Sequence, residues 1–349
     1  MSSVIQAAGS RHVRGGVKNT ARAWGWRAIG LTVTGVGLYV VAPSLVAVLD
    51  QWPDLQRVRP LWFVFLVLLE AGSMAALWFL LRITLPTTPW FVNASSQLAG
   101  NAAAKVLPGG NAAGSVVQAS MLVRGGQPSG AVATAMGSMG LLTTGMLLAL
   151  PILTVPAVIV RPPPARQLQL GLVVSLVMAV LLICLGLALL KWDRFLHAVG
   201  RGAGHVLHLV RRHISASEVA DKVTAQRDTV ADAFAGHWVR ALAFAAANRM
   251  LDYAALVASL YAVGARARPS MVLLAYVIAL GLALIPITPG GLGFVEAGLT
   301  TILVLAGVSA DQAVLGTLLY RLISFWLPIP IGALAWAGWR LHPSARSPG

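Results

Sequence analysis

Long apolar runs, separated by short polar stretches, fill most of the chain. Several runs reach the roughly 20 residues that an α-helix needs to cross the hydrocarbon core of a bilayer. This pattern predicts an all-α integral membrane protein, a polytopic helical bundle that forms a single transmembrane domain over residues 28–340. About six full spans are expected, at residues 28–49, 61–82, 129–159, 168–190, 239–263 and 311–338.

Two further apolar segments are interrupted by Pro-Gly-Gly. "KVLPGGNAAG" lies within residues 89–125, and "ITPGGLGF" lies within residues 271–308. Backbone freed by proline and glycine is tolerated at membrane depth when it is buried in protein or lines a wet cavity. We therefore expect two re-entrant hairpins, whose half-helix N-termini carry partial positive charge and suit an anionic group. The alternative is a kinked spanning helix with close glycine packing.

The order of span, broken segment and span occurs twice, over residues 61–159 and over residues 239–338. If each broken segment enters the membrane and returns, the two sets have opposite orientations. The sequence therefore predicts an inverted-topology repeat, with "LPGG" and "TPGG" at corresponding positions.

Composition supports the membrane assignment. Hydrophobic residues make up 57% of the chain and charged residues 11%, against about 25% charged residues in soluble domains. The net charge of +15 lies mostly outside the apolar runs. This distribution favours cytoplasmic loops in contact with anionic lipids over nucleic-acid binding. The single cysteine, Cys184, excludes an intrachain disulfide framework.

The distribution of lysine and arginine sets the expected orientation. The basic tail 1–27, the loop 191–238 and the tail 341–349 are all expected in the cytoplasm. Within the loop, basic residues recur at steps of three and four, which is typical of an amphipathic helix lying on anionic headgroups. Metal binding is the weaker alternative, because no acidic or cysteine partner is near. This expected anionic-lipid surface comprises Arg194, His197, Arg201, His205, His208 and Arg212.

Six ionisable residues lie inside apolar segments, three acids and three bases. Each costs about 2.5–3.5 kcal/mol at a helix centre, so we expect them to face inward and to pair. Arg249 and Asp252 are three positions apart and are expected to pair within one helix. The set forms either internal salt bridges that fix the packing or a polar path for a charged headgroup. Its members are Glu70, Lys105, Arg249, Asp252, Glu296 and Arg321.

Polar neighbours and helix ends complete the pattern. Asn101 shares a helix face with Lys105, and Asn248 shares one with Asp252. Arg82 and Arg124 lie near helix ends, where their side chains are expected to extend towards lipid phosphates.

The sequence contains no nucleotide-binding P-loop, no HExxH and no paired histidine–acid phosphatase pattern. We therefore expect a transporter-like protein without catalytic activity, metal or cofactor. Asp50 and Asp54, in "LDQWPD", leave open a lipid-linked glycosyltransferase, in which replacing Asp50 by alanine would abolish transfer.

The stretches "TPGGLGFVEAG" and "YRLISFWLPIPIGALAW" resemble the closing signature of the lysylphosphatidylglycerol synthase transmembrane (flippase-like) family. The first broken segment resembles the family's earlier pattern, except that Ser115 stands where the family often has an acid, with Gln118 further on. The matching residues are Asn101, Pro108, Gly109, Gly114 and Arg124 in the first half and Pro289, Gly290, Gly291, Gly293, Glu296, Arg321, Leu327, Pro328 and Gly332 in the second.

The resemblance implies a multi-pass protein of the bacterial inner membrane with paired re-entrant segments. In the best-understood members this domain moves aminoacylated phosphatidylglycerol between leaflets, and a separate soluble domain attaches the amino acid. That domain is not in this sequence, so we expect a stand-alone membrane domain that does not synthesise the lipid. The expected function is translocation of a phospholipid or an aminoacylated phosphatidylglycerol-type lipid.

The expected partners are anionic or aminoacylated membrane phospholipids and no nucleic acid. The alternative function is a non-transporting partner or scaffold of a separately encoded cell-envelope or lipid-synthesis enzyme, which would co-purify with it. The residues expected to bind the substrate are Glu70, Asn101, Lys105, Pro108, Gly109, Gly110, Asn248, Arg249, Asp252, Pro289, Gly290, Gly291, Gly293, Glu296 and Arg321.

Overall fold

The structure, a computed structural model, describes residues 58–107, 109–154, 236–283 and 291–342, with a few positions between 166 and 181. These parts of the chain are helical and contain no strand. The helices of the first half are α3 (Pro60–Thr84), α4 (Trp90–Val106), α5 (Asn111–Arg124), α6 (Ser129–Ala149) and the 3-10 helix η1 (Leu150–Thr154). Those of the second half are α11 (Trp238–Ala262), α12 (Pro269–Ala283), α13 (Phe294–Leu305), α14 (Ala310–Arg321), the π-helix η3 (Leu322–Trp326) and α15 (Pro328–Leu341).

Four helical stretches are long and apolar enough to cross a membrane, and they match four of the expected spans. They are Pro60–Thr84, Ser129–Leu153, Trp238–Ala262 and Ala310–Leu341. The all-helical membrane architecture is thus confirmed. The expected span 28–49, the basic surface of the 191–238 loop, the tail 1–27 and residues 343–349 lie outside the described residues, as does most of the span 168–190.

Each broken segment contains two short helices in place of one long one. In the first, α4 and α5 have 17 and 14 residues and pack against each other across a turn that contains Gly109 and Gly110. These glycines have φ values of +98° and +54°, which favour glycine. In the second, α12 and α13 have 15 and 12 residues and also pack together. A 17-residue helix is about 25 Å long, which is short of the roughly 30 Å hydrocarbon core.

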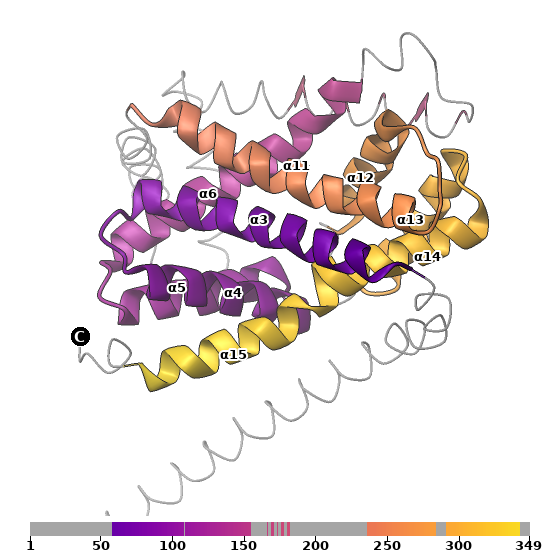
Figure 1. The fold of residues 1–349 in the computed structure, drawn as a ribbon. Coiled ribbons are helices and arrows are strands. Elements are labelled where there is room, and N and C mark those ends of the chain that lie inside the picture. The colour runs from indigo at the N-terminus through magenta and orange to yellow at the C-terminus, as the bar shows by residue number, and fades with distance from the viewer. Residues whose placement is uncertain are drawn as a thin grey trace, which may run out of the picture.

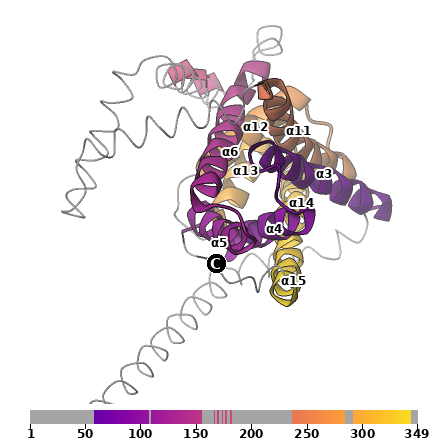
Figure 2. The same cartoon turned by 90° about the vertical axis from the view of Figure 1, so that its left-hand side faces the viewer.

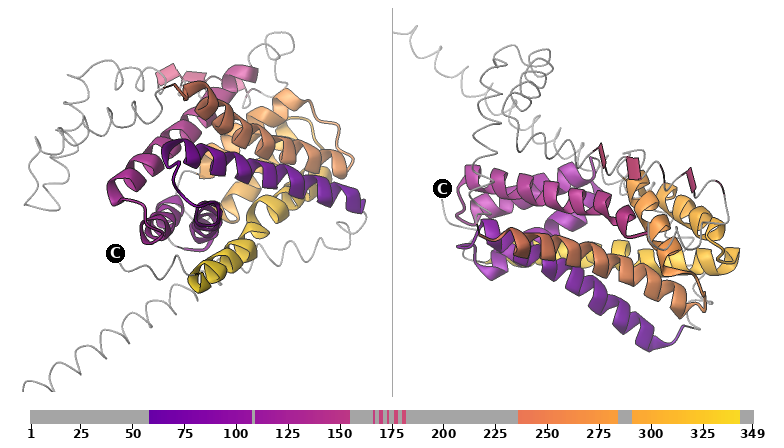
Figure 3. Two further views of the ribbon diagram at one scale, coloured as in Figure 1. Left: turned by 60° about the vertical axis from the view of Figure 1, so that its left-hand side comes forward. Right: turned by 90° about the horizontal axis from the view of Figure 1, so that it is seen from above.

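The helices α3 and α11 run side by side between the two short-helix pairs. Figure 1 shows α4, α5 and α6 on the left and α12, α13 and α14 on the right, and Figure 3 shows α3 beside α11 from above. Ser73 and Asn248 join the two long helices reciprocally. The Ser73 hydroxyl donates to the Asn248 carbonyl at 3.1 Å, and the Asn248 amide donates to the Ser73 hydroxyl at 2.8 Å. The pair fixes where the long helices cross.

Two glycine contacts hold the polar helix α4. A Cβ on Gly114 of α5 would meet the Gly100 carbonyl and lie 2.7 Å from the Ala104 Cβ. A Cβ on Gly332 of α15 would meet the Leu98 carbonyl. Small residues that allow backbones to approach closely are the usual means of helix association in membranes. In Figure 2, α4 accordingly lies between α5 and α15.

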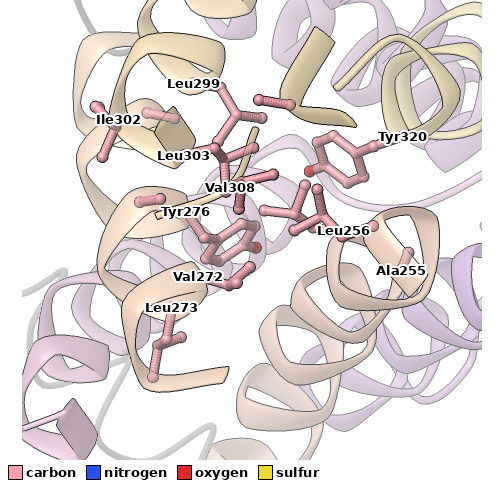
Figure 4. Close-up of a cluster of buried hydrophobic side chains, with 14 of the residues drawn as sticks. Ala255, Leu256, Val272, Leu273, Tyr276, Leu299, Ile302, Leu303, Val308 and Tyr320 are labelled. Carbon is pink, nitrogen blue, oxygen red and sulfur yellow. The ribbon is translucent and has the colours of Figure 1, made fainter. Parts of the chain in front are cut away.

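The main apolar core lies between α11, α12, α13 and α14. Leu256, Val272, Leu299 and Leu303 are almost fully buried there, together with the ring of Tyr276 (Figure 4). This core fixes the positions of the second-half helices whose polar side chains form the site described below. Large apolar side chains on the outer faces stay exposed, as expected for helices in contact with lipid; they include Leu61, Leu68, Leu141, Val239 and Leu334.

The stretch from Ala310 to Leu341 is helical throughout but changes its winding in the middle. In the π-helix η3 the Leu327 N–H donates to the Leu322 carbonyl, five residues back, at 3.0 Å. Pro328 follows directly and has no N–H, so it cannot bond to the Ser324 carbonyl as a regular helix residue would. Short π-helical segments occur frequently at functional sites.

Candidate functional site

Six charged side chains from five helices gather at the centre of the molecule. Glu70 comes from α3, Lys105 from the end of α4, Arg249 and Asp252 from α11, Glu296 from the first turn of α13, and Arg321 from the end of α14. Lys105 and Asp252 act electrostatically on Glu70, and Arg321 acts on Lys105. We call these six residues the charge cluster. The sequence predicted that they would face inward together, and in the structure five of them interact with one another, whereas Arg249 lies beside Tyr276, which binds Asp252.

Glu296 and Arg321 form the ion pair of the cluster. Arg321 Nε lies 2.7 Å from Glu296 Oε1, and their side chains are 10% and 14% exposed, respectively. The Arg321 guanidinium also stacks 4.2 Å from the centre of the Phe325 ring. The second carboxylate oxygen, Glu296 Oε2, is buried without a hydrogen-bond partner within the described part of the chain. A buried anionic oxygen of this kind is a ready acceptor for a cationic or hydrogen-bonding ligand.

Asp252 is held by two tyrosine hydroxyls. Tyr276 donates to Asp252 Oδ2 at 2.6 Å, and Tyr320 donates to Oδ1 at 2.9 Å. Both carboxylate oxygens are therefore satisfied from α12 and α14, not from Arg249 as the three-residue spacing suggested. Arg249 instead donates from Nε to the Thr143 carbonyl of α6 at 3.3 Å.

The two tyrosines did not appear among the predicted site residues. A signal for them existed, because a tyrosine in an apolar segment needs a partner for its hydroxyl, and Tyr320 directly precedes Arg321.

Removing either hydroxyl is expected to destabilise the fold. Tyr276→Phe and Tyr320→Phe should each lower the free energy of unfolding by about 1.5–3 kcal/mol, since each removes a buried hydrogen bond to a charged group. In an Asp252→Asn background the same changes should cost clearly less. The measurement is the unfolding midpoint in detergent, and Tyr261→Phe on the exposed face of α11 is the matched control. Equal losses with and without the Asp252 carboxylate would contradict the assignment.

Glu70 and Lys105 join the first-half helices to the cluster. Glu70 is 7% exposed, and its Oε2 has no hydrogen-bond partner within the described residues. Lys105 Nζ donates to the Ser324 carbonyl of the π-helix at 2.5 Å and lies 5.6 Å from the centre of the Phe325 ring. Lys105 thus donates to the Ser324 carbonyl, to which Pro328 cannot donate because it has no N–H. The cations Lys105 and Arg321 share the ring of Phe325, which brings two positive charges to one buried place.

The model of the lysylphosphatidylglycerol synthase TM region matches residues 27–332, which include the whole charge cluster. The chain belongs to this family. No curated protein was found to match the chain. The family places the chain among membrane proteins of lipid-related processes, in agreement with the resemblance seen in the sequence.

Ser115 follows Gly114 in α5, at the position where the resemblance led us to expect an acid. Ser115 is exposed at that position. Gln118, one turn further along α5, is buried and donates to Gln97 Oε1 of α4 at 2.5 Å. A neutral amide pair therefore stabilises the first hairpin, whereas a charged pair links α13 to α14 in the second half.

The remaining predicted site residues lie in different parts of the structure. Asn101 donates to the Met74 sulfur at 3.4 Å, and its Oδ1 is buried without a partner within the described residues. Asn248 belongs to the α3–α11 crossing. Gly291 and Gly293, with φ of +71° and +77°, precede α13. Pro108, Pro289 and Gly290 lie outside the described residues.

The two arginines near helix ends differ in their surroundings. Arg82 donates to the carbonyls of Pro86 and Thr88 and stacks 4.2 Å from the ring centre of Trp90, so it braces the α3–α4 turn. Arg124, the last residue of α5, is exposed, as a residue that extends towards headgroups would be.

Proposed function

We propose that this protein translocates a membrane phospholipid, or an aminoacylated phosphatidylglycerol-type lipid, between the leaflets of a bilayer. The headgroup would cross the membrane through the charge cluster while the acyl chains stay in the bilayer. The observation that carries this proposal is the group of six charged side chains on or beside membrane-spanning helices, in which one carboxylate oxygen each of Glu70 and Glu296 is buried without a hydrogen-bond partner within the described residues.

The depth of the cluster supports a transport path. Glu70 and Asp252 lie near the middle of α3 and α11, which have 25 residues each. The middle of such a helix is about 18 Å from either end, close to the centre of a hydrocarbon core about 30 Å thick. Charged side chains at this depth are rare and commonly mark substrate or ion pathways.

The chemistry of the cluster suits a headgroup with charges of both signs. The free oxygens of Glu70 and Glu296 would accept hydrogen bonds from its cationic part. Lys105, Arg249 and Arg321 would contact its phosphate, together with backbone N–H groups at the N-terminal ends of α5 and α13. Membership of the lysylphosphatidylglycerol synthase TM region family agrees with a phospholipid ligand.

The packing supports an inverted repeat of two re-entrant hairpins. Exchanging α3, α4, α5 and α6 for α11, α12, α13 and α14 keeps several contacts. α4 packs on α15 as α12 packs on η1, and each short-helix pair contacts the helix that follows it. The self-paired contact of α3 with α11 would lie on the pseudo-two-fold axis. Rocking of one half against the other would then expose the cluster to each side in turn.

We further propose that the protein acts without catalysis in the plasma membrane of a bacterium, with both termini in the cytoplasm. Anionic or aminoacylated phospholipids would be its partners, and a separately encoded lipid-synthesis enzyme would supply the modified lipid.

Leaflet exchange in proteoliposomes tests the proposal. Labelled phosphatidylglycerol and its lysyl form would be followed in vesicles with wild type, with Glu70→Gln, with Glu296→Gln or without protein. We expect exchange with wild type and a loss of about tenfold in the Glu70→Gln variant, since tenfold corresponds to one contact of about 1.4 kcal/mol. Glu70→Gln is preferred over Glu296→Gln as the first variant, because Glu296 is also held in an ion pair.

Asp311→Asn is the matched control, because Asp311 is an exposed acid in the first turn of α14. It should exchange lipid as wild type does. If vesicles with wild type exchange neither lipid faster than empty vesicles, the proposal is wrong. A scaffold that co-purifies with an envelope enzyme would then be favoured. Normal exchange by folded Glu70→Gln would move the path away from the cluster.

A further inference from the structure

An open cavity with apolar walls lies beside helices that carry residues of the charge cluster. It has a volume of about 310 Å³ and is formed between α3, α11 and the start of α12. Its lining includes Trp62, Phe65 and Leu69 from α3 together with Tyr253, Val257 and Tyr261 from α11. The three α11 residues are spaced by four and therefore share one face of the helix.

The cavity offers almost no polar group to a ligand. The Tyr253 hydroxyl, which would be its main polar group, donates to the Pro269 carbonyl at 2.7 Å. The rings of Trp62 and Phe65 meet edge to face with centroids 6.1 Å apart and shape the wall on α3. The cavity is thus built for an apolar occupant.

The neighbouring surface shows that the cavity faces the bilayer. Leu61 and Leu68, on the same helix as Phe65, are 78% and 63% exposed, and Tyr261 is 46% exposed at the other wall. In a membrane-spanning helix such residues contact acyl chains. An open, apolar cavity of about 310 Å³ can accept part of a flexible hydrocarbon chain.

The cavity and the charge cluster are neighbours. Leu69 lines the cavity and the next residue, Glu70, belongs to the cluster; Tyr253 lines it and the preceding residue, Asp252, belongs to the cluster. The Tyr253 ring packs edge to face on that of Tyr276, 5.8 Å between centroids, and Tyr276 donates to Asp252. The rings of Tyr253 and Tyr276 therefore link the wall of the apolar cavity to Asp252 of the charge cluster.

We infer that the cavity between α3 and α11 binds an acyl chain of a bilayer phospholipid beside the charge cluster. This inference rests on the proposed function, since an apolar chain site next to a charged headgroup site has the shape of one amphipathic lipid. The chain site holds an acyl chain of the lipid whose headgroup approaches the charge cluster. It also sets a preference for lipids with at least one chain long enough to fill the cavity.

Photolabelling of the full chain in liposomes tests the site. The probe is phosphatidylglycerol with a diazirine near the end of one acyl chain, present as a trace in phosphatidylglycerol and phosphatidylethanolamine vesicles. After illumination, we expect labelled peptides to concentrate on residues 62–69 and 253–261, at least about threefold above other lipid-facing stretches. Ala254→Phe, which places a ring in the cavity, should reduce this labelling several-fold.

Ala243→Phe provides the matched control, because Ala243 is an exposed alanine of the same helix outside the cavity. It should leave the labelling unchanged. Even labelling around all outward faces, or labelling that Ala254→Phe does not reduce, would overturn the inference. So would a photoreactive residue in place of Phe65 that cross-links to residues 28–49 instead of to lipid, since this chain would then fill its own cavity.

The same vesicles separate this inference from the proposed function, because labelling requires no transport. Labelling of the cavity without leaflet exchange would keep the acyl-chain site and reject translocation. Leaflet exchange without labelling of the cavity would keep translocation and reject the site.

Discussion

Arg321→Gln is expected to lower the free energy of unfolding by about 3–5 kcal/mol, the cost typical of removing one partner of a buried ion pair. The loss arises because Glu296 would lose its ion-pair partner in a mostly buried place, where its Oε2 has no hydrogen-bond partner within the described residues. The stacking of the guanidinium on Phe325 would be lost as well. The unfolding midpoint of purified protein in detergent, by heat and by increasing SDS, measures the change.

The double variant Glu296→Gln/Arg321→Gln distinguishes loss of charge balance from loss of packing. Two neutral amides can still hydrogen-bond, and no charge stays buried without a partner, so most of the lost stability should return. Arg266→Gln, in the exposed loop between α11 and α12, should have little effect. If the double variant is as unstable as Arg321→Gln alone, then Arg321 acts through packing, and the charge balance of the cluster matters little.

The sequence predicted the described spans because a bilayer imposes a length on them. The predicted span 61–82 corresponds to Pro60–Thr84, and 239–263 corresponds to Trp238–Ala262. The gathering of the charged residues was predictable for the same reason, because a charge at membrane depth must turn inward. Both results follow from the properties of the bilayer, which acts in the same way on every apolar segment that carries a charged residue.

The pairing of the charged residues could not be read from the sequence. Local spacing favoured Arg249 as the partner of Asp252. The hydroxyls of Tyr276 and Tyr320, 24 and 68 residues away, instead donate to the two oxygens of Asp252. Such contacts depend on how α12 and α14 pack against α11, which helical periodicity does not encode. The same holds for Lys105 and the Ser324 carbonyl, which lie 219 residues apart.

The glycines of the two family motifs showed two uses that the sequence left open. Gly109, Gly110 and Gly293 adopt positive φ at turns, as the hairpin interpretation requires. Gly114 and Gly332 lie in helices and allow backbones to approach, as the packing alternative requires. Glycine thus serves both purposes in this chain, at different residues, and re-entry of the broken segments into the membrane stays a prediction. The sequence alone does not show whether a glycine is needed for its backbone conformation or for the close approach of a neighbouring helix.

Gly332→Ala and Gly338→Ala are expected to change stability in opposite directions, although both glycines lie in α15. A Cβ on residue 332 would meet the Leu98 carbonyl and lie 2.5 Å from the Ala102 Cβ, so α15 would have to move away from α4. We expect a loss of about 1–3 kcal/mol from this overpacking. A Cβ on residue 338 has nothing within 4 Å, so alanine there should be neutral or stabilise the helix by up to about 1 kcal/mol.

The same displacement should reach the charge cluster, because α4 carries Lys105 at its end and α15 follows directly on the π-helix that contains Ser324. Gly332→Ala should therefore also slow leaflet exchange, whereas Gly338→Ala should not. The unfolding midpoint and the exchange rate, measured for both variants in one membrane preparation, check the two effects together. Equal responses at the two glycines would show that the close contact of α15 with α4 does not hold the cluster in place.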